Sequence, residues 1–189
     1  VPGDNVIAVE IHQSSSTSTD ISLDLELTAA QREVSTLVPL GAYWKYEASG
    51  TDLGTAWRAT AYDDAAWTGG PSQLGYGDGD EATLVPKTSP VYPCYYFRHE
   101  FNVADPGAIP DLTLRLLRDD GAVVYLNGTE IARYSLPAGA ISFTNWATTA
   151  TNYDWDPAVA VPVNLILPGK NVLAVEIHQC NSTSSDISL

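Results

Sequence analysis

The chain has 189 residues, 44% of them hydrophobic and five of them tryptophan, a composition typical of one folded domain rather than of a disordered chain. Its formal net charge of -14 argues against nucleic-acid binding, because such proteins need a basic surface to neutralise phosphates. No apolar run approaches the ~20 residues of a membrane-spanning helix. We therefore expect no nucleic acid as a partner and no membrane-spanning segment.

Two stretches of closely similar sequence open and close the chain. Residues 1–23 and 167–189 agree at 17 of 23 positions when they are aligned at an offset of 166. Self-similarity at a fixed period is the signature of a tandem array of modules. The first copy continues into Asp24–Thr28 (DLELT), whereas the second copy ends at Leu189.

The repeat divides the chain into three expected parts. Residues 1–28 are predicted to be the C-terminal hairpin of a preceding repeat, or a strand donor to a neighbouring module. Residues 29–37 are predicted to be a connector, and residues 38–189 to form one module that lacks its last few residues.

Alternation of apolar and polar residues predicts β-strands along most of the chain. In the first copy, Asn5–Gln13 and Ile21–Leu27 both alternate with period two and are expected to pair as a hairpin, as are their counterparts at the C-terminal end. Asn127-Gly128 is a strong signal for a second hairpin. Strands are also predicted at Val38–Ala48, Cys94–Val103, Leu112–Leu117, Ala122–Leu126, Thr129–Tyr134 and Val159–Ile166.

Many short strands with turn signals between them indicate an all-β fold. We predict a two-sheet antiparallel jelly-roll-like sandwich with long loops.

Three groups of residues carry a resemblance to a known fold family. They are Thr55–Arg58 with Tyr62–Trp67 and Leu74–Gly77, then Asp119–Gly128, then Pro168–Glu176. In this order they resemble the galactose-binding-domain-like β-sandwiches, which include sugar-binding jelly rolls of glycosidases and accessory modules of large secreted bacterial proteins. The resemblance covers about residues 38–189. It implies a secreted or cell-surface bacterial protein, and many members of the family are non-catalytic.

Two acidic loops are candidate metal sites. Asp78, Asp80 and Glu81 place three carboxylates within four residues, and a hard cation such as Ca²⁺ takes 6–8 oxygen ligands. The alternative is a solvated acidic turn. Asp119 and Asp120 precede a glycine, so turn capping is the favoured interpretation. In sandwiches of the resembling family this region lies near a ligand or metal edge, and some members carry a structural calcium ion.

Tryptophan side chains are the candidate glycan contacts, because a sugar ring packs on an aromatic face. Trp57 and Trp67 lie in the motifs that carry the resemblance and are expected in the core. Trp146 and Trp155 lie in a long polar stretch and are the predicted ligand-binding residues.

The two cysteines, Cys94 and Cys180, allow two interpretations: one disulfide bond, or two buried thiols. His178 alternates out of phase with the apolar residues of its strand and shares a face with Glu176. A strand histidine satisfied by a neighbouring group is the default expectation.

No nucleophile elbow or metalloprotease motif occurs in the sequence, so an enzyme in its own right is not expected. The preferred hypothesis is a non-catalytic tandem-repeat module of an extracellular structural or adhesive protein. Its partners would be neighbouring copies of the same module, assembled into a fibre through strand complementation. The alternative hypothesis is a carbohydrate-binding module of a secreted hydrolase, with a glycan as partner.

Overall fold

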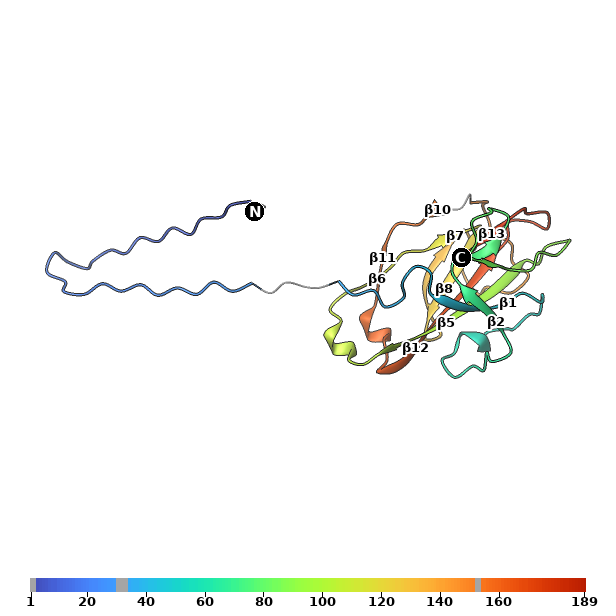
Figure 1. Ribbon diagram of the computed structural model, residues 1–189, viewed down its shortest axis with the longest axis horizontal. Coiled ribbons are helices and arrows are strands. Elements are labelled where there is room, and N and C mark those ends of the chain that lie inside the picture. The colour runs from blue at the N-terminus through green and yellow to red at the C-terminus, as the bar shows by residue number, and fades with distance from the viewer. Residues whose placement is uncertain (1–2, 30–33, 152–153) are drawn as a thin grey trace. The chain divides into compact units, whose positions relative to one another are not determined.

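The computed structural model describes residues 3–29, 34–151 and 154–189 (Figure 1). The chain divides into two compact units, Val1–Ser35 and Thr36–Leu189. Among the described residues, no helix is long and apolar enough to cross a membrane.

The second unit is built from strands and three single-turn 3-10 helices. The helices are η1 (Ala56–Arg58), η2 (Pro106–Ala108) and η3 (Val163–Leu165). The strands are β1 (Tyr43–Glu47), β2 (Thr68–Pro71), β3 (Leu74–Tyr76), β4 (Thr83–Leu84), β5 (Cys94–Val103), β6 (Leu112–Leu114), β7 (Leu117–Arg118), β8 (Gly121–Leu126), β9 (Thr129–Tyr134), β10 (Asp154–Trp155), β11 (Val159–Val161), β12 (Gly169–His178) and β13 (Ile187–Ser188).

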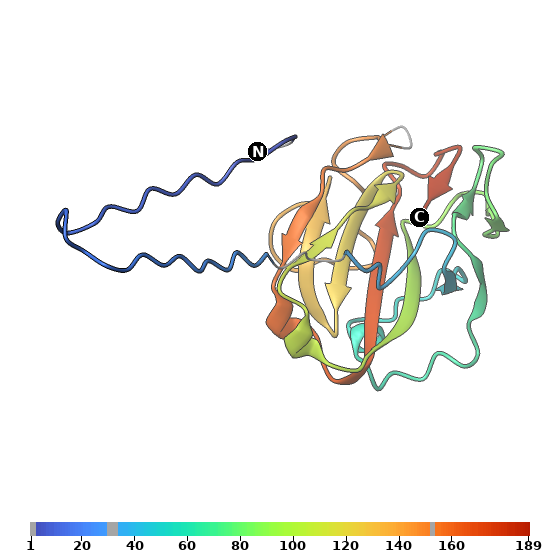
Figure 2. The same ribbon diagram turned by 60° about the vertical axis from the view of Figure 1, so that its left-hand side comes forward.

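Strand β12 lies inside a six-stranded sheet of order β2-β1-β5-β12-β8-β9 (Figure 2). It pairs antiparallel with β5 along its whole length, from Gly169 opposite Val103 to His178 opposite Cys94. On its other edge it pairs with β8. Consecutive side chains alternate between the two faces of this sheet, and both faces are covered.

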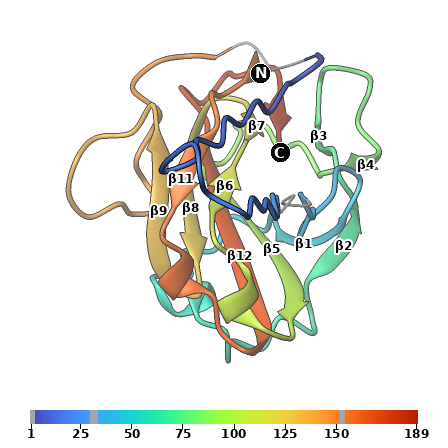
Figure 3. The same cartoon turned by 90° about the vertical axis from the view of Figure 1, so that its left-hand side faces the viewer.

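One face of the large sheet packs against a second layer of short strands (Figure 3). This layer contains the sheets β13-β3-β4, β10-β7 and β11-β6. Apolar side chains of both layers, such as Val175 and Ile187, share one core. At Gly75 the strands β3 and β13 approach so closely that a Cβ would collide with the carbonyl oxygen of Ile187. The predicted all-β sandwich is confirmed.

The opposite face of the large sheet is covered by loops rather than by strands. Trp57, in η1, is fully buried there against Tyr96 and Tyr125. Trp67 packs at the margin of the same cluster and is half-buried. Trp57 therefore takes the core position that the sequence predicts, whereas Trp67 packs against the core from its edge.

The predicted strands agree best with the structure at the centre of the large sheet. At its edge the strand predicted over Val38–Ala48 is shorter, Tyr43–Glu47, and the sequence pattern does not predict β2 as a separate strand. Cys94–Val103 and Thr129–Tyr134 have the predicted bounds, and Asn127-Gly128 is the hairpin turn with positive φ at both residues. Leu112–Leu117 is two strands, β6 and β7, because they pair with different partners, β11 and β10. The strand predicted over Val159–Ile166 ends at Val161, before a proline that has no N–H to donate.

The predicted C-terminal hairpin is wrong. Strand β12 belongs to the six-stranded sheet, whereas β13 pairs with β3 in the other layer. The connection between them crosses from one layer to the other, so the two strands cannot be neighbours. The buried side chain of Gln179 stabilises this crossing by donating to the carbonyl oxygen of Asp186, 2.8 Å away, and to the hydroxyl of Tyr76.

The first unit is extended chain. A turn at Ser15–Ser18 reverses its direction, and none of residues 3–29 is in a strand, so no paired hairpin forms there. The assignment of residues 1–28 to a preceding repeat, or as a strand donor to a neighbouring module, stays a prediction. A two-stranded hairpin has no second layer to cover its apolar face and is marginal in water. The valines, isoleucines and leucines among residues 3–29 are accordingly exposed. The predicted connector, residues 29–37, lies partly outside the described residues.

A buried ion cluster holds the loop after η1 against the large sheet. Arg98 of β5 donates to Asp64 at 2.8 Å and to the carbonyl oxygens of Trp57 and Ala59. Lys45 of β1 donates to the other carboxylate oxygen at 2.6 Å. Burial alone would raise the pKa of Asp64, but the hydrogen bonds from Arg98 and Lys45 outweigh burial and lower it.

The repeat provides a matched pair of mutations that measures how much burial in β12 stabilises the protein. Ile177 is 0% exposed, whereas Ile11, at the same position of the first copy, is 41% exposed. We expect Ile177→Ala to lower the free energy of unfolding by about 2–5 kcal/mol, and Ile11→Ala to change it by less than about 0.5 kcal/mol. Urea denaturation measures both, and equal effects would contradict the assignment of β12 to the core.

The Asp64 cluster should make stability depend on acid pH. Because the pKa of Asp64 is lower in the folded state, its contribution is fully present above the ordinary value of 3.8 and disappears as pH falls through the folded-state pKa. We expect Asp64→Asn to cost about 3 kcal/mol at pH 7, and the cost to shrink below about pH 4. Urea denaturation across this range is the measurement, with the exposed neighbour variant Asp63→Asn as control. A cost that does not depend on pH would contradict the lowered pKa.

Candidate functional site

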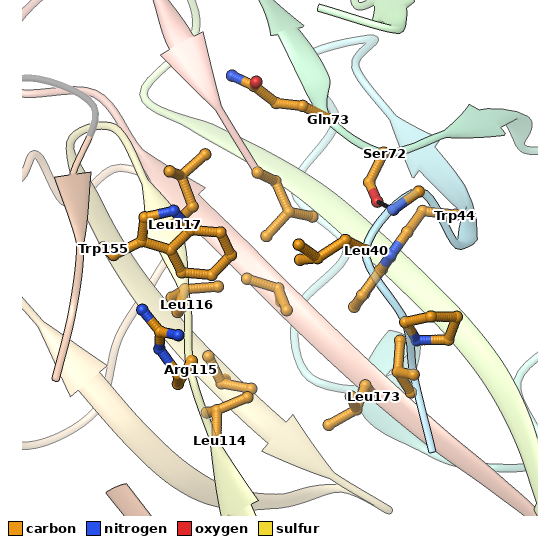
Figure 4. A pocket seen from close by; sticks show the side chains of 16 residues that line it. Leu40, Trp44, Ser72, Gln73, Leu114, Arg115, Leu116, Leu117, Trp155 and Leu173 are labelled. Carbon is orange, nitrogen blue, oxygen red and sulfur yellow. Dashed lines mark hydrogen bonds between the residues drawn. The ribbon is translucent and has the colours of Figure 1, made fainter. Parts of the chain in front are cut away.

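An apolar groove of about 300 Å³ opens in the second unit beside the end of β13 (Figure 4). One wall is the irregular stretch that joins β6 to β7, and the floor is formed by side chains of β12 and β8. The other wall comes from the segment before β1 and from Ser72, whose hydroxyl accepts a hydrogen bond from the backbone of Gly41. Residues that line the groove include Leu40, Leu114, Arg115, Leu117, Trp155 and Leu189.

Trp155 is the exposed aromatic residue of this groove. Its strand, β10, pairs with β7, so that Trp155 lies opposite Leu117. The side chain is 39% exposed, and the guanidinium carbon of Arg115 lies 5.0 Å from the ring centroid. Trp146 is half-buried in the preceding loop and does not line the groove. The structure therefore does not bring the two predicted ligand-binding tryptophans together at this groove.

A second candidate site, which is polar, is buried under the loops on the opposite face of the large sheet. Glu176 of β12 accepts hydrogen bonds at Oε1 from Tyr125 at 2.6 Å and from Arg58 at 3.2 Å. Its other oxygen, Oε2, lies 3.5 Å from Nε2 of His178 and 4.0 Å from Sγ of Cys94. The guanidinium of Arg58 also stacks 4.1 Å from the ring centroid of Tyr125. A carboxylate of this kind is stable in the interior because each oxygen has polar neighbours.

Burial controls the protonation of this cluster. Burial, and then the negative charge of Glu176, raises the pKa of the Cys94 thiol well above its ordinary value. The same two causes raise the pKa of Tyr125. At neutral pH both groups therefore keep their protons, and Tyr125 acts as a donor to the carboxylate.

The predicted acidic loops have other hydrogen-bond partners. Hydrogen bonds from its own backbone N–H, and then from those of Asp78 and Gly79, lower the pKa of Glu81. Asp78 accepts from the hydroxyl of Ser188 at 2.7 Å. Asp80 lies in the same exposed loop.

The second acidic loop caps backbone groups, as its turn composition predicts. Asp120 is buried and accepts from the N–H groups of Thr151 and Cys180 at 2.9 and 2.7 Å, while the backbone of Asp119 bridges to Ser188. In the described part of the chain, these five carboxylates form no group of three close enough to share an ion. Calcium binding by these loops stays a prediction.

The predicted disulfide is absent: Cys94 and Cys180 are both free thiols. The reason is the register of the large sheet, in which His178, not Cys180, lies opposite Cys94. The alternative interpretation, two buried thiols, holds for Cys94 but not for Cys180. Cys94 is buried, whereas Cys180 is partly exposed beyond the end of β12 and accepts a hydrogen bond from Asn181.

The buried Cys94–Glu176–His178 cluster was only half visible in the sequence. Period two places Glu176 and His178 on one strand face, as expected. The pairing of β5 with β12, which adds the thiol, has no local sequence signal.

Comparison with known proteins identifies a similar fold. No protein-family model matches the chain, and no curated protein matches it. A β-glucuronidase from an uncultured Clostridium species is similar in structure, with a TM-score of 0.52, 18% identity, and coverage of 81% of this chain and 24% of that one. The β-glucuronidase of Ruminococcus gnavus is similar with a TM-score of 0.51 and 17% identity, and the match covers 81% of this chain and 23% of that one. A glycosyl hydrolase family 2 member from Bacteroides cellulosilyticus has a TM-score of 0.47 and 14% identity, and the match covers 75% of this chain and 17% of that one. The chain thus spans about a quarter or less of the length of these enzymes.

Proposed function

We propose that this chain contains a non-catalytic, galactose-binding-like β-sandwich module associated with a glycoside hydrolase, and that the module binds a glycan at the groove beside Trp155. The fold similarity to parts of β-glucuronidases supports an accessory module, because the chain covers 24% and 23% of those enzymes. The observation that carries the glycan proposal is the exposed ring of Trp155 in an otherwise apolar groove.

The chemistry of the groove suits a sugar. An aromatic ring buries the apolar face of a pyranose, and an amphipathic tryptophan does so while it remains partly in water. Arg115, adjacent to the ring, supplies N–H donors for hydroxyl or carboxylate oxygens of the glycan. We further propose that the protein is bacterial and is secreted or on the cell surface, where such glycans occur.

Replacing Trp155 tests the glycan proposal. A panel of neutral and uronic-acid-containing oligosaccharides is titrated by calorimetry against the whole chain. We expect Trp155→Ala to weaken the best binder by at least about tenfold, because central aromatic residues dominate binding energy. Tyr43→Ala removes an aromatic side chain that is also exposed but does not line the groove, and should leave affinity unchanged. Failure of the wild-type chain to bind any member of the panel would overturn the proposal.

A second candidate function is association between copies of the chain. Ile187 and Leu189 alternate into the core, and their counterparts in the first copy are Ile21 and Leu23. In the first copy the same alternation continues with Leu25 and Leu27, which are 52% and 75% exposed. The groove lies beside Leu189. We infer that a strand with the pattern of Asp24–Thr28, supplied by a second copy, can add to the second layer next to β13 and place both leucines in this groove.

This candidate function has its own test. We expect the wild-type chain to associate on concentration in sedimentation velocity, and Leu25→Asp with Leu27→Asp to abolish association, since each buried leucine contributes about 1.5–3 kcal/mol. Val34→Asp changes an equally apolar, 97% exposed residue outside the segment and is the control. The double variant should keep its glycan affinity, which separates the two proposals. A wild-type chain that stays monomeric at all concentrations would contradict association.

A further inference from the structure

Three metal-binding atoms converge in the buried cluster on β5 and β12. Sγ of Cys94, a carboxylate oxygen of Glu176 and a ring nitrogen of His178 lie within 4.8 Å of one another. In the part of the chain that the structure describes, this is the group of three such side chains close enough to hold one ion. All three residues are almost completely buried.

The hydrogen bonds of His178 leave one ring nitrogen directed into the cluster. Nδ1 lies 2.7 Å from the carbonyl oxygen of Asn145. A carbonyl oxygen can only accept, so Nδ1 carries a proton, and Nε2 is the ring nitrogen that can offer a lone pair to a metal ion. Among the described residues, Nε2 has no hydrogen-bond partner, although it is completely buried. A buried polar atom in this state is costly unless an ion or a proton occupies the space in front of it.

The carboxylate of Glu176 also directs one of its two oxygen atoms into the cluster. Its Oε1 already accepts hydrogen bonds from Tyr125 and Arg58, which leaves Oε2 facing the histidine and the thiol. Metal ligands in proteins are typically fixed by outer hydrogen bonds of this kind: a carbonyl that holds the other nitrogen of a histidine, and donors that hold the second oxygen of a carboxylate.

We propose that Cys94, Glu176 and His178 bind one zinc ion, which links β5 to β12 beneath η1. Thiolate, imidazole and carboxylate together are a ligand set that zinc accepts, and they leave one tetrahedral position for water. Binding releases the proton of Cys94 to solvent, because the thiolate is the ligand. This site differs in place and in ligand chemistry from the two acidic loops and from the groove.

The repeat adds an observation in the same direction. Glu10 and His12 occupy the positions of Glu176 and His178 in the first copy, whereas Cys180 is replaced by Ser14. Two of the three proposed ligands, Glu176 and His178, thus recur in the first copy, whereas Cys180, which is not a proposed ligand, does not. In the first unit Glu10 and His12 are exposed, 3.2 Å apart, so they need a control of their own.

Metal reconstitution of the whole chain tests the site. The chain is unfolded in guanidinium with a chelator, refolded with Zn²⁺ or Co²⁺, freed of unbound metal by gel filtration, and its metal content measured. To exclude the other candidate ligands, the reference protein carries Cys180→Ser and His12→Gln. We expect about one ion per chain, and a thiolate-to-cobalt charge-transfer band with Co²⁺, which in this protein only Cys94 can produce.

Variants of the ligands complete the test. Cys94→Ser and His178→Gln, each in the reference protein, should reduce bound zinc to less than about a tenth of an ion per chain and remove the rise in melting temperature that zinc gives the reference protein. If either variant does not fold, the cobalt spectrum of the reference protein decides alone. The proposal is overturned if the reference protein, refolded with Zn²⁺ or Co²⁺, contains no bound metal after gel filtration. It is also overturned if the cobalt complex lacks the thiolate band.

Discussion

The burial of β12 on both faces is the constraint on which the rest of this structure depends. One face of the strand requires the second layer of short strands, since Val175 and Ile177 would otherwise meet water. The other face requires the loops that carry Trp57 and Phe143. The closely similar sequence in the first copy has neither cover, and its apolar side chains are exposed. Strand formation here depends on what surrounds the segment more than on its own propensity.

A strand buried on both faces must also satisfy every polar side chain that it carries. Glu176 obtains donors from β8 and η1, and His178 obtains an acceptor from the loop at Asn145. These contacts join three segments that are far apart in the sequence. The polar cluster therefore contributes to the selection of one arrangement of the covering loops, because loops that did not supply Arg58 and the carbonyl of Asn145 would leave Glu176 and Nδ1 of His178 with fewer partners in the interior.

The two candidate sites differ because they lie on opposite faces of the same sheet. The groove on the side of the short strands is apolar and open, since β6 and β7 diverge where their pairing partners change. The proposed occupants of this groove are a sugar ring or an added strand. The cluster on the loop side is polar and closed, with side chains that can hold an ion. Neither site requires the module to be catalytic.

The sequence by itself determined the fold class, most strands of the large sheet, and the shared face of Glu176 and His178, because these follow from period-two alternation and local turn chemistry. The core position of Trp57 followed from the motif in which it lies. Only the tertiary structure decided the rest. It placed β12 and β13 in different layers, set Cys94 opposite His178 rather than Cys180, and brought Trp155 but not Trp146 to the groove. These features depend on the pairing of strands distant in sequence, and no local pattern of residues encodes such pairing.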